Sequence, residues 1–78
     1  MSDLTPLPAL TPGLYRHFKG GSYQVLDVVR HSETLEPMVL YRPLDEDIGV
    51  WVRPYDMFCA QVEADGVWRP RFALVTAD

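Results

Sequence analysis

Apolar residues fall into short runs along the chain, which predict β-strands and leave no helical stripe. The longest run is Ser22–Arg30. Its apolar residues occupy both alternation sets, so we expect a strand that is covered on both faces. The other predicted strands are Leu14–Phe18, Met38–Arg42, Val50–Arg53, Ala60–Ala64 and Val67–Val75. Tyr55–Phe58 has room for only one helical turn.

Turn residues separate these runs. Asp65-Gly66 between the last two runs is a strong hairpin signal, because both positions tolerate a positive φ. Pro43, Pro54 and Pro70 each follow an arginine near a predicted strand end, where the missing N–H of proline is tolerated. Five or six short strands with at most one helical turn predict a mainly β fold, a small, SH3-like, partly open barrel.

The chain divides into a tail and one domain. Residues 1–12 contain three prolines and no apolar period, so we expect a flexible, proline-rich tail. The remaining residues 13–78 form a single domain, because 78 residues leave room for only one.

Charge and cysteine content limit the binding partners and the cellular location that we expect. Seven Lys/Arg against eleven Asp/Glu give a net charge of −4, which disfavours charge-driven binding to nucleic acid or anionic lipid. The single cysteine, Cys59, permits no internal disulfide and is expected to be a small core residue. No apolar run reaches the length of a membrane span, and the N-terminus lacks a signal-peptide pattern, so we expect a cytoplasmic location.

The segment His31–Glu36 concentrates a histidine, two hydroxyls and two carboxylates between predicted strands. The favoured interpretation is a turn in which the hydroxyls of Ser32 and Thr34 bind backbone amides. A ligand-binding loop is the alternative, and a hydrolase that uses His31 with Glu33 or Glu36 is a weaker one. Sequence neighbours rarely form a catalytic triad, because adjacent strand residues point to opposite faces.

The first predicted strand places Tyr15, His17 and Lys19 on one face, and this face is exposed to solvent if Phe18 is buried. Two cationic residues beside an aromatic ring can grip a carboxylate, a phosphate or a base, although an ordinary solvated face is the simpler interpretation.

Arg53 is the third candidate, because a guanidinium binds carboxylates through two parallel hydrogen bonds. The favoured interpretation pairs it with Glu33 or Glu36, which would pin the His31–Pro37 loop to the barrel; the alternative is an anchor for an anionic ligand. We expect Trp51 and Trp68 to lie in the core or to form half-buried walls, since an exposed tryptophan would mark a binding surface.

No metal or cofactor is expected. His17, His31 and Cys59 lack the paired spacing of metal ligands. Gly20-Gly21 is not followed by the helix that a phosphate-binding loop requires.

Three strings together are familiar: GLYRHFKGG at Gly13–Gly21, HSETLEP at His31–Pro37 and WVRP at Trp51–Pro54. With Met57-Phe58, Gly66 and Arg71-Phe72 they make the chain resemble a bacterial family of small proteins known only as domain-of-unknown-function family 1653 (DUF1653). The resemblance runs from about Gly13 to Phe72 and omits the tail, and Asp45–Gly49 is individual to this chain. It implies an SH3-type barrel and no established activity.

These features predict a non-catalytic binding module for a protein or a small anionic ligand. Its candidate surface consists of Tyr15, His17, Lys19, His31, Glu33, Glu36 and Arg53. A single-stranded nucleic-acid binding domain, which would use the six arginines and stacked aromatics, is the second hypothesis. The small hydrolase is the third. An unpaired edge strand could also support a dimer.

Overall fold

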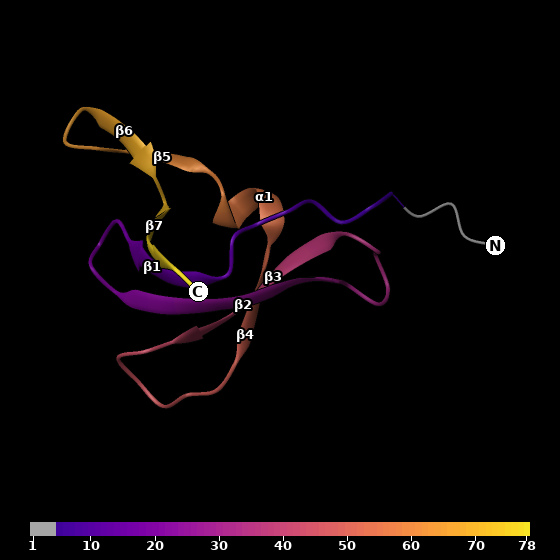
Figure 1. Ribbon diagram of the computed structural model, residues 1–78. Coiled ribbons are helices and arrows are strands. Elements are labelled where there is room, and N and C mark those ends of the chain that lie inside the picture. Colours follow the sequence, from indigo (N-terminus) through magenta and orange to yellow (C-terminus); the bar gives the residue numbers. More distant parts are fainter. Residues whose placement is uncertain (1–4) are drawn as a thin grey trace.

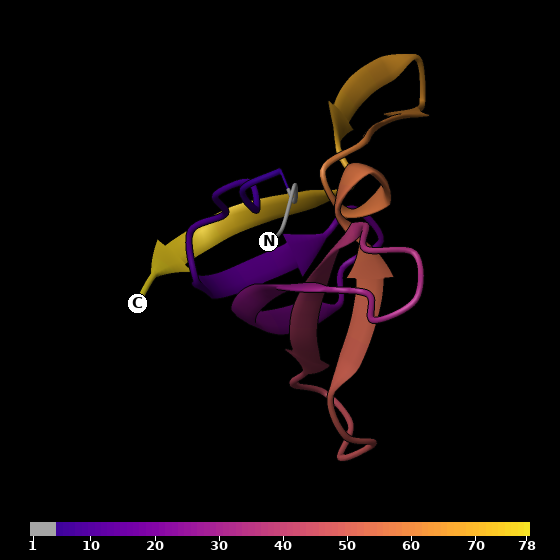
Figure 2. The same cartoon turned by 90° about the vertical axis from the view of Figure 1, so that its right-hand side faces the viewer.

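The computed structural model describes residues 5–78, which form a curled sheet and a projecting hairpin (Figures 1 and 2). The elements in chain order are β1 (Gly13–His17), β2 (Ser22–Arg30), β3 (Pro37–Pro43), β4 (Trp51–Pro54), α1 (Tyr55–Phe58), β5 (Gln61–Ala64), β6 (Val67–Pro70) and β7 (Phe72–Ala77). Five strands form one antiparallel sheet in the order β4-β3-β2-β1-β7, and β5 pairs with β6 apart from it. The mainly β, partly open barrel that the sequence predicts is confirmed.

The strand count exceeds the five or six expected, because the predicted run Val67–Val75 is two strands. The chain leaves β6 at Arg71, whose amide donates to Ala60 O at 2.9 Å and whose carbonyl accepts from Phe18 N at 2.9 Å. It then joins β1 as β7. The hairpin turn at Asp65-Gly66 is confirmed, with φ of 55° and 77°.

Strand β2 is covered on one face rather than on both. Val25 and Val28 are buried three positions apart, while Leu26 between them is exposed. The pairing with β3 shifts between Val25 and Asp27, which inserts an extra residue into β2. Such a bulge reverses the alternation. It therefore lets both valines face the core, and this explains why both alternation sets look apolar in the sequence.

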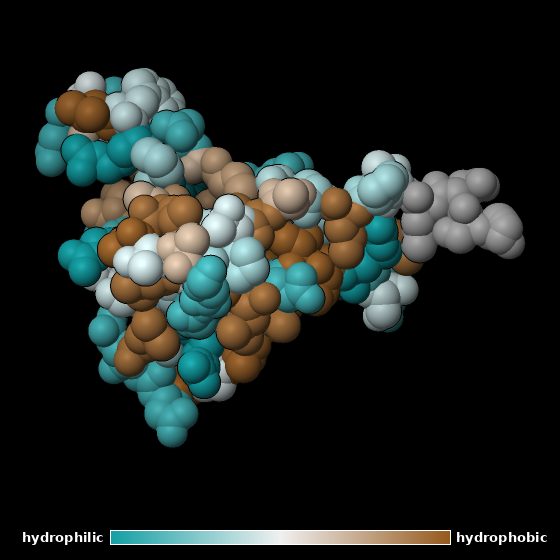
Figure 3. All heavy atoms as spheres, viewed as in Figure 1, coloured by the Kyte–Doolittle hydropathy of each residue, from teal (hydrophilic) through white to brown (hydrophobic). Residues whose placement is uncertain are grey.

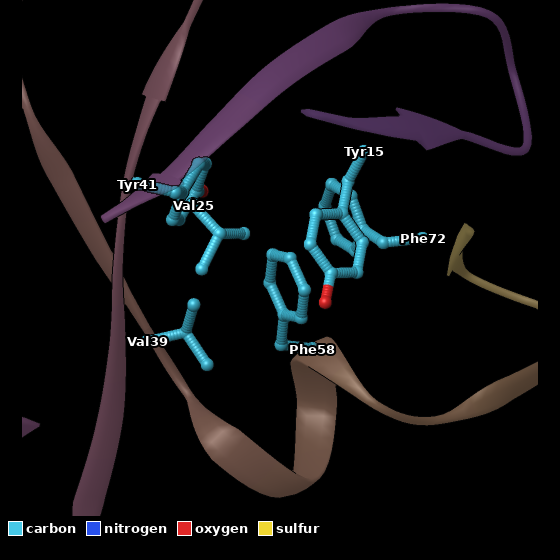
Figure 4. Close-up of a cluster of buried hydrophobic side chains, with 6 residues drawn as sticks. All are labelled: Tyr15, Val25, Val39, Tyr41, Phe58 and Phe72. Atoms are coloured by element: carbon cyan, nitrogen blue, oxygen red, sulfur yellow. The ribbon is translucent and has the colours of Figure 1, made fainter. Parts of the chain in front are cut away.

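The core lies on the inner face of the curled sheet and is mostly aromatic (Figure 4). It consists of Tyr15, Val25, Val39, Tyr41, Phe58 and Phe72. The single turn of α1 inserts Phe58, which is 1% exposed and stacks on Phe72 with ring centroids 4.1 Å apart. The ring of Tyr15 meets Phe58 edge-on at 5.6 Å. These contacts fill the inner face of the curled sheet.

Residues 5–12 contain no strand or helix, but they lie against the domain instead of forming a free arm. The hydroxyl of Tyr55 donates to Ala9 O at 3.0 Å, and that of Tyr15 donates to Thr11 O at 2.7 Å. Leu10 packs against the core. The first four residues of the predicted tail lie outside the described residues.

Two expectations about burial are wrong. Trp68 is 66% exposed, because the hairpin that carries it stands away from the sheet (Figure 2). Cys59 is exposed, since its neighbour Phe58 takes the inward position of α1. Trp51, which was expected in the core or in a half-buried wall, is also exposed, at 50%. In residues 5–78 no helix is long and apolar enough to cross a membrane.

Candidate functional site

The seven predicted surface residues do not form one surface. Tyr15 is buried in the core, so its predicted place on a solvent-exposed face is wrong. His17 precedes β2 and His31 follows it, so the nine-residue length of β2 separates the two histidines. Figure 1 places the β1–β2 turn and the β2–β3 turn at opposite ends of the sheet. The remaining candidate residues therefore lie in two separate clusters.

The first cluster includes Arg53 and gathers at the rim of the inner face. Arg53 pairs with Val39, and Trp51 pairs with Tyr41. Directly opposed residues in an antiparallel pair point to the same side of the sheet. Because Val39 and Tyr41 are core residues, Arg53 and Trp51 also point to the inner side. Tyr23 packs against the same core from β2.

The guanidinium of Arg53 lies among aromatic rings. Its Cζ is 5.6 Å from the centroid of the Phe72 ring, which is a cation–π distance. Its Nε is buried and has no hydrogen-bond partner in the described residues. A buried donor without an acceptor costs about 1–3 kcal/mol. The expected internal pair of Arg53 with Glu33 or Glu36 is therefore replaced by stacking on an aromatic ring.

His17 adjoins this guanidinium. Its ring meets Phe72 edge-on at 4.8 Å, and its Nδ1 accepts from Lys19 N at 3.1 Å. Burial lowers the pKa of His17, and the positive charges of Arg53, Arg71 and Lys19 lower it further. The imidazole is therefore held in its neutral form beside Arg53 near neutral pH.

A hollow of about 190 Å³ opens at this rim, and we call it the rim pocket. Its lining is Tyr23, Tyr41, Pro43, Glu46, Ile48, Trp51 and Arg53. The loop before β4 forms one wall, held where Trp51 Nε1 donates to Ile48 O at 3.3 Å and Ser22 N donates to Asp45 Oδ2 at 3.1 Å. The rim pocket thus offers one guanidinium, aromatic surface and one carboxylate.

The second cluster, the β2–β3 turn, satisfies its own polar groups. The ring of His31 accepts at Nδ1 from Glu33 N at 3.1 Å and from Thr34 N at 3.2 Å. The Thr34 hydroxyl accepts from Glu36 N at 3.3 Å and donates to Glu36 Oε1 at 3.2 Å. The Thr34 hydroxyl thus binds a turn amide as predicted, whereas the amides of Glu33 and Thr34 are bound by the His31 ring and not by the Ser32 hydroxyl.

Arg30, not Arg53, ties the β2–β3 turn to the rest of the protein. Its Nη1 donates to Leu35 O at 3.0 Å, and its Nη2 donates to Thr5 O at 2.7 Å. This single side chain therefore joins the turn to the N-terminal segment. The sequence gives no sign of this role, because it depends on how the N-terminal segment lies against the turn.

A larger hollow, of about 460 Å³, lies between the N-terminal segment and α1. It is lined by Pro8, Glu36, Pro37, Pro54, Tyr55, Asp56 and Met57. Its two charged groups are both carboxylates, and Glu36 already accepts from Thr34. It therefore lacks a cation to orient an anionic ligand.

Sequence reasoning singled out Arg53 and Trp51 in the rim pocket and His17 beside it, but it missed the other residues of the lining. Tyr23, Tyr41 and Glu46 come from strands and a loop whose pairing the sequence does not reveal. The one available signal was that Trp51 and Arg53 share a face of the same strand. Within residues 5–78 no group of three or more His, Cys, Asp or Glu side chains is placed to hold a metal ion.

Comparison with known proteins gives a family and a solved structure. Residues 13–74 match the family model described as a protein of unknown function, DUF1653. The chain is also similar to a crystal structure of a DUF1653 protein from Bordetella bronchiseptica, with a TM-score of 0.82 and 32% identity over 94% of this chain and 96% of that one. No curated protein matches the chain.

Proposed function

Because the chain belongs to the DUF1653 family of proteins of unknown function, we propose its function from the rim pocket alone: it is a non-catalytic module that binds a small anionic ligand. The ligand carries one carboxylate or phosphate group on an apolar or aromatic body. The buried, unpartnered Nε of Arg53 carries this proposal.

The chemistry of the lining supports such a ligand. An oxyanion that accepts from the Arg53 guanidinium forms a charge-assisted bond, and an oxyanion that reaches Nε also removes the cost of the unpaired donor. Tyr23, Tyr41 and Trp51 supply flat apolar surface for the body of the ligand. At about 190 Å³ the rim pocket suits a single functional group with part of a ring, rather than a large cofactor.

Charge in the rim pocket favours a ligand with one anionic group over a polyanion. Glu46 lines the same hollow, so its carboxylate repels a second phosphate. The net charge of −4 acts in the same direction over the whole chain. A nucleic-acid strand is therefore a weaker candidate and serves as a comparison ligand in the test.

The test is a calorimetric titration of the full chain with acetate, benzoate, phenyl phosphate, benzylamine and a single-stranded oligonucleotide. We expect benzoate and phenyl phosphate to bind and benzylamine not to bind. Arg53→Lys should weaken binding roughly tenfold or more, because an ammonium cannot copy the planar fork of the guanidinium.

The matched control is Arg42→Lys, which changes an exposed arginine on the neighbouring strand β3 and should leave binding unchanged. Equal binding of benzoate to the wild type and to folded Arg53→Lys would contradict the proposal. Salt-sensitive binding of the oligonucleotide alone would replace it with the nucleic-acid hypothesis.

A further inference from the structure

Strand β7 forms one edge of the five-stranded sheet, and its one device against further pairing is the register shift with β1 that leaves Val75 without a partner residue. It contacts β1 on one side, and within residues 5–78 no strand pairs with its other side. Its sequence, FALVTA, contains no charge and no proline, and all five residues after Phe72 are exposed. Leu74 is 46% and Val75 is 52% exposed. Such an edge is a template for another strand.

The opposite edge, β4, is built differently. It has only four residues and includes Arg53 and Pro54. The acidic residues Asp45–Asp47 lie in the loop that precedes it. Short length, charge and proline are the devices that keep sheet edges from pairing. The contrast indicates that β7, and not β4, is the edge available to a partner.

We infer that β7 pairs antiparallel with β7 of a second copy of this chain, about a two-fold axis near Leu74 and Val75. In this isologous arrangement each edge supplies the same surface, and the free backbone groups of one β7 bond to those of the other. A two-fold axis perpendicular to the sheet keeps the inner faces together. Figure 3 shows hydrophobic side chains on the surface where Figure 1 places β7 and β1.

The charged residues at the two ends of β7 are complementary when two β7 strands pair antiparallel. Arg69 and Arg71 precede the strand, and Arg16 pairs with Ala73 near its start. Asp78 follows its other end. Antiparallel self-pairing brings Asp78 of each copy to the arginine end of the other.

A groove lies over the paired strands β1 and β7, near the start of β7. Its volume is about 290 Å³, and its lining includes Arg16, Arg69, Ala73 and Val75. The arginines therefore flank the outer face of β7 where the second strand would end. An uncharged apolar strand from another protein would leave these arginines unmatched.

Light scattering after size-exclusion chromatography, over the micromolar range, tests the pairing. We expect the wild type to be a dimer that dissociates on dilution. Val75→Lys should weaken the dimer roughly tenfold or more, because it places a charge at the centre of the paired strands. Val52→Lys is the matched control, since Val52 is 50% exposed on the other edge strand and its change should leave the dimer intact.

Amide hydrogen exchange gives a second readout that needs no variant. The amides of Leu74 and its alternate neighbours should become protected as the concentration of the chain rises. A monomeric wild type, or a dimer that Val52→Lys disrupts and Val75→Lys does not, would overturn the inference. Either result leaves the rim-pocket proposal standing, because no lining residue of the rim pocket lies in β7.

Discussion

The rim pocket and the β2–β3 turn each contain a polar side chain that the sequence indicates as a candidate binding residue. The side chain in the turn has hydrogen-bond partners, whereas the one in the rim pocket has an unpartnered donor. In the turn, the His31 ring accepts two amide protons and Thr34 bridges to Glu36. In the rim pocket, the buried Nε of Arg53 meets no acceptor in the described residues. A cluster that satisfies itself stabilises the fold, whereas the proposed ligand site rests on a buried donor that is left unsatisfied.

The rim pocket rests on the aromatic core, whereas the β2–β3 turn is held by its own hydrogen bonds. The largest predicted effect tests the aromatic packing beneath Arg53. Phe58→Ala should lower the free energy of unfolding by about 3–5 kcal/mol, because Phe58 is fully buried and stacks on Phe72 beneath Arg53. Chemical denaturation measures the loss. Met57→Ala, an exposed neighbour on α1, should change stability by no more than about 0.5 kcal/mol. Similar losses for both variants would contradict the packing described here.

Two arginines give the sharpest contrast between the clusters. Arg30→Met should lower stability by about 1 kcal/mol, because it removes the bonds to Leu35 O and Thr5 O. Arg53→Met should leave stability unchanged or raise it, because it removes an unpaired buried donor and retains apolar contact with Phe72. Thermal unfolding of both variants checks this order. A larger loss of stability in Arg53→Met than in Arg30→Met would contradict this contrast.

Removing the His31 ring should have a moderate effect that is confined to the turn. His31→Ala deletes the acceptor of the Glu33 and Thr34 amides, at a cost of about 0.5–1.5 kcal/mol. Ligand binding at the rim pocket should be unaffected, since β2 separates the two clusters. Loss of ligand binding in a folded His31→Ala chain would place function in the turn instead.

The pH dependence of stability is the smallest of the predicted effects. Burial and the neighbouring cations lower the pKa of His17 in the folded state, so the unfolded state binds more protons. Stability should therefore fall as the pH drops below about 6.5, the ordinary histidine value, toward the lowered pKa. In His17→Asn this loss should be smaller than in the wild type. His31→Asn serves as the control, and an unchanged slope in His17→Asn would show that other groups cause the loss.

The sequence predicted strand positions well because alternation and turn residues are local properties. Ser22–Arg30 and the Asp65-Gly66 turn were placed correctly for this reason. The bulge at Leu26 was not predictable, because it depends on how β2 pairs with β3. The break at Arg71 is also set by tertiary contacts, through its bonds to Ala60 and Phe18.

The candidate site was predicted only in part. Residue chemistry identified Arg53 and His17, but the partners proposed for Arg53 were wrong, because sequence distance says little about which strands curl together. Tyr23 and Glu46 reach the rim pocket through this curl. The exposure of Trp68 likewise follows from a hairpin that stands apart from the sheet.

The most direct test of a ligand site at Arg53 is nitrogen-detected or proton–nitrogen NMR of the side-chain N–H groups during titration with benzoate. We expect saturable shifts of Arg53 Nε–H and of the Trp51 indole, with the amides of Glu33 and Thr34 unmoved. Shifts that centre on the β2–β3 turn, with Arg53 Nε–H unchanged at saturation, would contradict it.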